Sequence, residues 1–527
     1  MVAPLIAVRL RSQLSALRSS PWSMVGYVLL AVMLLPLFVG LTVGLSSLRS
    51  LPDARSPLML AAGAALVLVW TFGSVLFFAM DDSVSPQRLV LFPLRSRDLV
   101  VPLLVSDLLT LPGAFTLLVC CGFVIGWATD PLLAIAGIAS TVLGLLTGML
   151  AGRILVTALS HWLAARKSRD LLYVVLLLGL IAISWGVPLL GRGMFDLGPN
   201  WETVELVGGA AGWTPMGWAW TLPADLAAGR SGLAALRLAL ALVLLVAMAW
   251  LWSRQLDRAL TTPLPSAGSG APTVSSPWLD RLFPPGPAGA IATRNLRYLR
   301  RDPRRFASVL VIMATPFFVV FANMVRDEKL VPEFLWLVVA LATWMGGIGA
   351  LQDTPMDGSA LWLHAVSGIR GFEDRLGRLM ANSLIYGGTF AVTMVLASAL
   401  LEAWGVFPFA FGLGLGALIA NQGMSLLVSS FLNGTAPPPG TNPFASTSKG
   451  QGAAFLASVL QMIGSVILLL PVAGMVFASY RFPLLGWVFL PVGPVLGVLA
   501  ALGLISLGGR RLDRTWPEVL KAVTYEK

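Results

Sequence analysis

The chain has 527 residues and a formal net charge of +11, with 57% hydrophobic and only 12% charged residues. Soluble globular proteins carry about 25% charged residues, and a soluble chain of this length would divide into several domains that each need a polar exterior. The composition therefore excludes a soluble fold and indicates an integral membrane protein whose excess apolar surface faces lipid.

Apolar runs long enough to cross a bilayer follow one another along the whole chain. In the first part of the chain they cover residues 24–45, 58–80, 100–127, 132–159, 171–190 and 233–252. In the second part they cover residues 306–325, 334–352, 376–401, 406–432, 455–478 and 484–507. The pattern predicts an all-α integral membrane fold with about twelve transmembrane helices.

The loops between these runs differ strongly in basic residues. Most of the loop Lys and Arg residues fall on the side of the N-terminus, which predicts that both termini are cytoplasmic in a multi-pass protein of the plasma membrane. The positive charge is explained by this topology and by attraction to anionic headgroups. Since no basic soluble domain is present, nucleic acid is not expected as a partner.

A weak internal repeat divides the chain into two. The residues Leu14, Leu17, Arg18 and Pro21 precede the first run, and Leu296, Leu299, Arg300 and Pro303 precede the seventh with the same spacing. Each set belongs to a basic amphipathic segment of the kind that lies on a membrane surface. The repeat predicts two parallel six-helix halves, residues 1–252 and 290–527, each starting with an interfacial helix and joined by a cytoplasmic linker, residues 253–289.

Motifs for catalysis are missing from the sequence. No G-x-x-x-x-G-K-[ST] loop occurs, so the chain is not expected to bind ATP phosphates itself. The two histidines, His161 and His364, fall on different loops and are interpreted as surface residues. We expect no catalytic residue, no metal site and no cofactor on this chain.

Ionisable and amide groups inside the spans are the candidates for a substrate path, because burying them in lipid is unfavourable. Arg153 lies near the inner end of the fourth run, where it either reaches the headgroups or faces an inner cavity, paired with Asp107 or with a substrate anion. Asn421 and Gln422 occupy the corresponding depth in the tenth run. These four residues are the predicted path candidates.

Two inner loops, residues 85–109 and 358–385, share a second pattern. Each has a short apolar piece, a small residue or Pro, mixed charges and then the next span. A short apolar helix with charged flanks suits docking into a groove of a soluble partner, and the alternative is a plain surface helix with topogenic arginines. The candidate docking residues are Arg88, Pro93, Arg95, Arg97 and Asp98 in the first loop and Arg370, Glu373, Asp374 and Arg375 in the second.

The stretch LFPLRSRDL at residues 91–99 resembles the "P-L-S-R-R-E-L" stretch of the permease subunits of type-2 ABC exporters, in their fused two-half, twelve-span form. In that family this loop forms the coupling helix that touches the ATPase. The second loop, residues 365–375, lacks the Pro-Leu pair. The resemblance implies two copies of a separate ABC ATPase that carry ATP and Mg, and an exported lipophilic substrate such as a drug, an antibiotic or a lipid-like molecule, as in multidrug efflux.

Two other functions stay open from the residues alone. An ion-coupled secondary transporter needs acidic groups near the bilayer midplane, and Asp107 is the nearest candidate. A membrane enzyme acting on lipid intermediates needs clustered His, Asp or Glu at one interface, for which Asp353 and Asp357 are the candidates.

Overall fold

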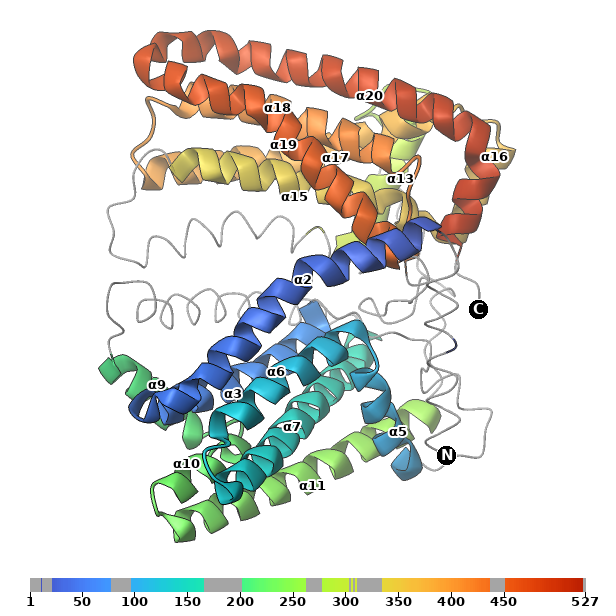
Figure 1. The fold of residues 1–527 in the computed structure, drawn as a ribbon. Coiled ribbons are helices and arrows are strands. Elements are labelled where there is room, and N and C mark those ends of the chain that lie inside the picture. The colour runs from blue at the N-terminus through green and yellow to red at the C-terminus, as the bar shows by residue number, and fades with distance from the viewer. Residues whose placement is uncertain are drawn as a thin grey trace.

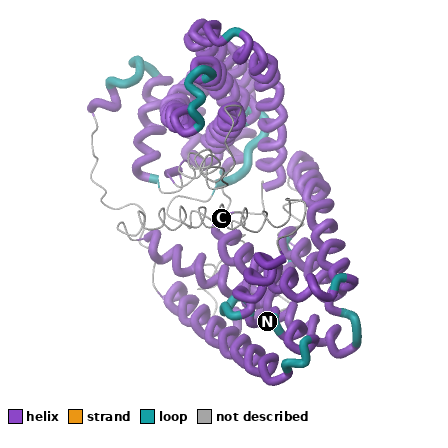
Figure 2. The backbone as a smooth tube through the Cα atoms, turned by 90° about the vertical axis from the view of Figure 1, so that its left-hand side faces the viewer, coloured by secondary structure: helices purple, strands orange, loops and turns teal. Residues whose placement is uncertain are grey.

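The computed structural model describes residues 11, 21–76, 96–164, 201–261, 277–302, 305, 306, 309, 334–436 and 451–524. Within these ranges the chain is helical and contains no strand (Figure 2). Nine of the described helices are long and apolar enough to cross a membrane, and one bent pair makes a tenth. The all-α membrane fold is confirmed at this level. The predicted run 171–190, most of run 306–325 and most of the N-terminal surface segment lie outside the described residues.

The described part of the first half begins with a long apolar helix and ends with another. Its elements are α2 (Pro21–Ser47), η1 (Leu48–Ser50), α3 (Pro52–Leu76), α5 (Ser96–Leu108), α6 (Leu111–Trp127), α7 (Pro131–Ala164), α9 (Trp201–Gly212), η3 (Trp218–Trp220), α10 (Leu222–Ala227) and α11 (Ser231–Thr261). The third run, expected as one span, is two helices bent by 80°. Thr110 starts the second of them, because its hydroxyl accepts from the Gly113 amide at 3.2 Å, and Pro112 cannot donate into a continuing α5.

Of the six runs predicted in the second half, five are described as helices, and run 306–325 lies mostly outside the described residues. The elements of this half are α12 (Pro277–Asp280), α13 (Pro287–Arg301), α15 (Phe334–Asp357), η4 (Gly358–Leu361), α16 (Trp362–Val366), α17 (Gly371–Leu400), α18 (Phe407–Val428), α19 (Gln451–Arg481), η5 (Pro483–Leu485) and α20 (Gly486–Val523). α13 coincides with the predicted second surface segment. α20 continues past the predicted end at residue 507, through a kink at Thr515.

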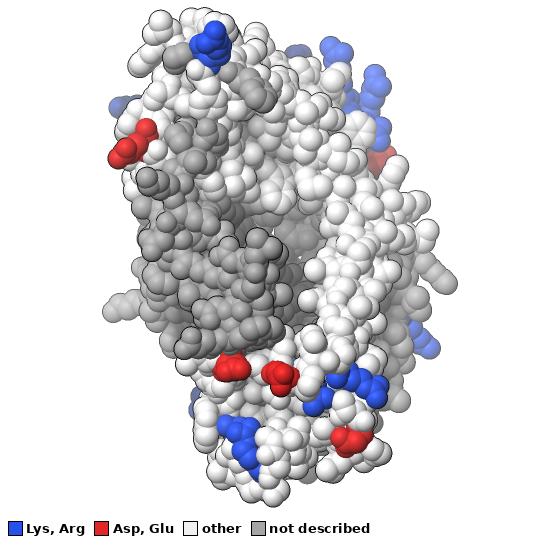
Figure 3. Space-filling view, turned by 60° about the vertical axis from the view of Figure 1, so that its left-hand side comes forward, with Lys and Arg blue, Asp and Glu red and all other residues white. Residues whose placement is uncertain are grey.

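The described helices before residue 262 form a lower layer and those after residue 276 form an upper layer, with α2 running between the layers (Figure 1). α2 packs on α6 of its own half and on α19 of the other. The pairing inside the layers is alike: α3 packs on α7 and α7 on α11 below, and α15 packs on α18 and α18 on α20 above. Among the described residues, few of the side chains on the face seen in Figure 3 are charged.

Glycines bring α18 and α20 into direct backbone contact. A Cβ added at Gly416 would lie 2.1 Å from the Gly493 carbonyl oxygen, and one added at Gly497 would lie 2.2 Å from that of Gly416. Small residues at such spacing let helices approach closely in a membrane. The close approach packs α20 tightly against α18.

Trp220 holds the connecting segment before α11 to the lower layer. Its indole lies against Gly63 of α3 and Gly144 of α7, where an added Cβ would come within 2.3 and 2.2 Å of the ring. The side chain is 2% exposed. The outer segment predicted between the fifth and sixth spans is therefore packed into its half, in its described part.

Candidate functional site

Charged residues gather where α15 ends and α17 begins. Asp353 and Asp357 are four residues apart, as are Asp374 and Arg378, and side chains at that spacing share one face of a helix. The two faces meet, and Arg294 of α13 and Arg305 join them. We call this group, with His364 and Arg375, the ion network.

Asp357 is the centre of the ion network. Its carboxylate accepts from Arg294 at 2.8 Å, from Arg305 at 2.5 Å and from Arg378 at 2.5 Å. The carboxylate side chain is 1% exposed. Three guanidinium groups from three segments thus converge on one buried acid, which ties α13, α15 and α17 together.

His364 links the second predicted docking loop, residues 358–385, to the same network. A guanidinium can only donate, so Nε2 of His364 accepts from Arg294 at 2.6 Å, and the ring proton sits on Nδ1, which donates to Asp374 at 2.7 Å. Asp374 also accepts from Nε of Arg378 at 3.0 Å. The single turn α16 is therefore attached to both α13 and α17 through one buried imidazole.

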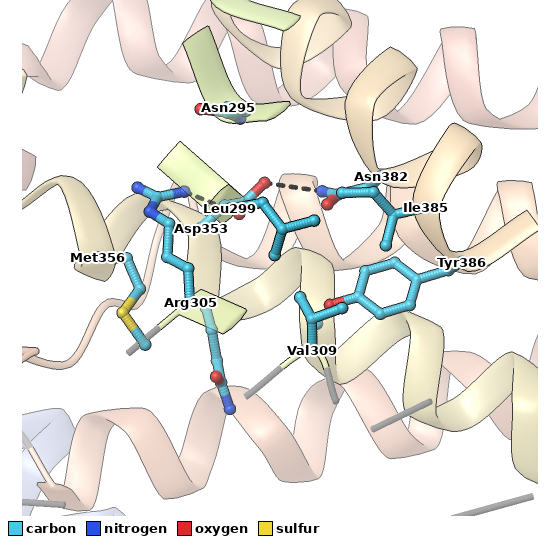
Figure 4. Close-up of a pocket in the computed structure, with 11 residues that line it drawn as sticks. Asn295, Leu299, Arg305, Val309, Asp353, Met356, Asn382, Ile385 and Tyr386 are labelled. Carbon is cyan, nitrogen blue, oxygen red and sulfur yellow. Dashed lines mark hydrogen bonds and ion pairs between the residues drawn. The ribbon is translucent and has the colours of Figure 1, made fainter. Parts of the chain in front are cut away.

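Two further contacts extend the ion network toward the bundle. Asp353 accepts from Arg305 at 3.4 Å and from Asn382 at 2.7 Å, and Figure 4 shows the two donors reaching it from opposite sides. Arg375 donates to the Thr354 hydroxyl at 2.7 Å. The pocket beside Asp353 has a cavity volume of about 30 Å³, room for one or two water molecules and too small for an organic substrate.

The charges in this network nearly balance. Asp353, Asp357 and Asp374 face four arginines: Arg294, Arg305, Arg375 and Arg378. A buried charge whose partner is removed costs about 3–5 kcal/mol, so each member depends on the others. The arrangement holds helix ends in place.

Among the described residues, no group of three or more His, Cys, Asp or Glu is placed to hold a metal ion.

α16 turns an apolar face outward while its histidine points inward. Trp362, Leu363 and Val366 are 52%, 53% and 74% exposed, whereas His364 is 3% exposed. These three apolar side chains form an exposed patch on the short helix. The loop thus carries an apolar projection held from behind by the ion network.

Glycines in left-handed conformation frame this projection. Gly358, with φ of 53°, ends α15, and Gly368, with φ of 66°, follows α16. Residues with a Cβ rarely adopt this region, and glycine does so without strain. The two turns let the chain leave α15, form α16 and re-enter as α17.

The predicted docking residues of the second loop divide into two groups. Arg370 is exposed, and its amide donates to Glu373 at 3.3 Å. Asp374 and Arg375 are 0% exposed, because α17 begins at Gly371, earlier than predicted, and carries them into the ion network. Asp374 and Arg375 are therefore not available for direct contact with a partner in this conformation.

The predicted docking residues of the first loop are mostly outside the described residues. Arg88, Pro93 and Arg95 lie in the range 77–95, and Arg97 and Asp98 fall in the first turn of α5. Their part in docking stays a prediction.

Arg153 and Asp107, two path candidates, bind each other. Nε of Arg153 donates to Asp107 at 2.8 Å, and a second nitrogen donates to the other carboxylate oxygen. The guanidinium also lies 5.7 Å from the centre of the Trp252 ring. Of the two roles considered for Arg153, this geometry matches pairing with Asp107 and not an extended side chain among headgroups.

Asn421 and Gln422, the other two candidates, are 0% exposed and join helices. The Asn421 amide donates to the Thr343 carbonyl at 2.8 Å, and Gln422 accepts from the Ser383 hydroxyl at 2.8 Å. Both act as interhelical hydrogen-bonding groups in this conformation. Whether any of the four candidates lines a substrate path stays a prediction.

Sequence reasoning missed Arg294, Arg305, Arg378 and the buried position of His364. The one local signal was the pair Asp374 and Arg378, whose i,i+4 spacing at the start of an apolar helix suggests a buried pair. The comparisons add no constraint: no protein-family model, no curated protein and no solved structure matches this chain.

Proposed function

We propose that this chain is the permease subunit of an ATP-driven ABC exporter of the plasma membrane. In this proposal it has twelve spans in two parallel halves, with both termini cytoplasmic, and it moves a lipophilic substrate, such as a drug, an antibiotic or a lipid-like molecule, out of the cell. ATP is hydrolysed on two copies of a separate ATPase subunit. The substrate passes between the halves.

The observation that carries the proposal is the construction of α16. A coupling element has to offer a surface to a soluble partner and pass its displacement to spanning helices. α16 exposes Trp362 and Val366, and through His364 it is fastened to α13 and α17. Because packed and ion-paired elements move as rigid bodies, a push on α16 shifts the ends of these helices together.

Matching polar contacts support the two-half arrangement. In the first half, Arg153 of α7 binds Asp107 of α5, and in the second, Gln422 of α18 binds Ser383 of α17. These helices are the predicted fourth and third spans of each half. Equivalent spans are thus joined by polar side chains in both halves.

The alternative function, an ion-coupled transporter, has less support than the exporter. A proton or sodium carrier needs an acid that changes its charge or ligands during the cycle. Each acid of the ion network already has an arginine partner, and so does Asp107. The same pairing disfavours a membrane enzyme that would use Asp353 and Asp357 in catalysis.

Co-purification with an ATPase tests the proposal. The chain is expressed with each separate ABC ATPase subunit of its source genome, and with one of them we expect a stable complex whose ATP hydrolysis accompanies transport. Val366→Ser weakens the complex, whereas Leu484→Ser, at another highly exposed aliphatic residue, in η5, leaves it intact. Transport by the chain with no ATPase present would overturn the proposal.

A further inference from the structure

The last part of α20, residues 510–523, turns back toward α16. Thr515 has φ of −133° and ψ of 25°, outside the helical region, and Pro517 removes a backbone donor just beyond it. Figure 1 shows the end of α20 descending beside α16. We call residues 510–523 the C-terminal segment.

The apolar side of the C-terminal segment is used in packing against the docking loop. Leu512, Val519 and Val523 form a buried cluster with Leu361, which is 1% exposed. Trp516 meets the His364 ring edge-on, with ring centres 6.3 Å apart. The segment therefore supports η4 and α16 from behind.

A hydrogen bond and a backbone contact fasten the other end of the loop. The Asp513 carboxylate accepts from the Gly371 amide at 2.6 Å, one of the free donors at the start of α17. A Cβ added at Gly371 would lie 2.3 Å from the Gly509 carbonyl oxygen. The docking loop is thus held at both ends by α20.

The outward side of the C-terminal segment is basic. Arg511, Arg514 and Lys521 are exposed, and so is Arg370 at the end of the loop. Of the two exposed acids of the segment, Asp513 is engaged with Gly371, which leaves Glu518. Positive charge therefore borders the apolar projection of α16.

We infer that the docking surface is a composite of α16 and the C-terminal segment, and that it fits a groove of the ATPase that is apolar at its base and acidic at its rim. The inference rests on the proposed function. An apolar centre with a charged border is the ordinary anatomy of a protein interface. Lipid is the less fitting occupant of the C-terminal segment, because its apolar side is already buried against Leu361 and does not face outward to enter a bilayer.

Charge reversal at the border tests the composite surface. The full chain is reconstituted in lipid nanodiscs, and its affinity for the ATPase that co-purifies with it is measured at low and high salt. Arg514→Glu with Lys521→Glu should weaken binding about tenfold at low salt, and the loss should shrink at about 0.5 M salt, since rim charges act through screened attraction. The control is Arg481→Glu, an exposed arginine at the end of α19. Affinity equal to that of the control would overturn the inference.

Photo-crosslinking separates this inference from the function it rests on. A photoreactive amino acid is placed at Trp362 in one variant and at Lys521 in another. Crosslinks from both positions to the ATPase support the composite surface. A crosslink from Trp362 alone, or a phospholipid adduct at Lys521, overturns it and leaves the exporter proposal standing. Failure of any ATPase to bind the chain overturns the exporter proposal itself.

Discussion

At the scale of single residues, Asp357 shows how a charge is kept inside an apolar protein. It accepts from Arg294, Arg305 and Arg378, which lie 63, 52 and 21 residues away along the chain. Each guanidinium offsets part of the desolvation of the acid, and the acid does the same for them. Such a group is stable only as a whole, which makes it sensitive to the loss of any member.

Arg378→Met should destabilise the protein by about 3–5 kcal/mol, because it leaves Asp357 and Asp374 with fewer partners in a buried site. The measurement is the unfolding midpoint of the detergent-solubilised chain. Arg481→Met, at an exposed site, serves as the matched control and should leave the midpoint unchanged. Equal midpoints for the two variants would show that the ion network does not stabilise the fold.

The pair of Arg153 and Asp107 allows a charge exchange. Asp107→Arg and Arg153→Asp should each lower stability, since each places two like charges together, and the double variant should recover part of the loss. The midpoint of thermal unfolding of the four proteins gives the coupling. If Arg153 merely reached the headgroups, its change and that of Asp107 would add without recovery.

Local spacing made part of this residue-level picture predictable. Arg153 is recognisable as a charge within an apolar run, and Asp107 is one of its two predicted partners, the other being a substrate anion. The ion network was not foreseen, because His364 and Arg294 are 70 residues apart and nothing in either segment points to the other. Long-range pairing of polar groups depends on the packing of helices, which the sequence of a single span does not specify.

At the scale of elements, the contact of α18 with α20 depends on glycines, which have no side chain to keep the two backbones apart. Gly412 and Gly416 face Gly493 and Gly497 with backbone against backbone. The apolar runs 406–432 and 484–507 predict α18 and α20, but they do not predict that these two helices pack on each other. Helix ends were also misplaced where polar residues continue a helix beyond the apolar run, as in α17 and in the C-terminal segment.

Gly493→Val should lower the stability of the protein by about 3 kcal/mol or more, at the upper end of what overpacking costs. The added Cβ would lie 2.2 Å from the Gly412 carbonyl oxygen, and a backbone atom cannot move aside easily. Gly503→Val is the control in the same helix, since a Cβ there meets nothing within 4 Å. The yield of monodisperse protein after detergent extraction and its melting temperature report the difference. A Gly503 variant as unstable as the Gly493 variant would point to helix propensity instead of packing.

At the scale of the whole molecule, the described helices join into two layers that meet through α2. The hydropathy runs predict most of the long helices that the structure describes, whereas the packing of helices on one another was not predicted. The packing of α2 on α19 was not predicted, because both sequences have only the pattern of ordinary transmembrane helices. It depends on Gly26, which lies directly against the Gly452 carbonyl oxygen, so that a Cβ there would be 1.8 Å from it.

This crossing makes the joining of the halves testable in the full chain. A site for a specific protease is inserted in the linker at residues 262–276, and the purified protein is cleaved in detergent. The two halves should stay together on size-exclusion chromatography, because α2 packs on α19 without help from the linker.

Gly26→Leu should then let the cleaved halves separate, since the added side chain drives α2 away from the α19 backbone. Gly40→Leu, in the same helix and with nothing within 4 Å of its Cβ, should not. In an exporter whose substrate passes between the halves, the uncleaved Gly26→Leu variant should also lose transport while its α16 surface still binds the ATPase. Halves that stay together in both variants would place their main attachment elsewhere than at the contact of α2 with α19.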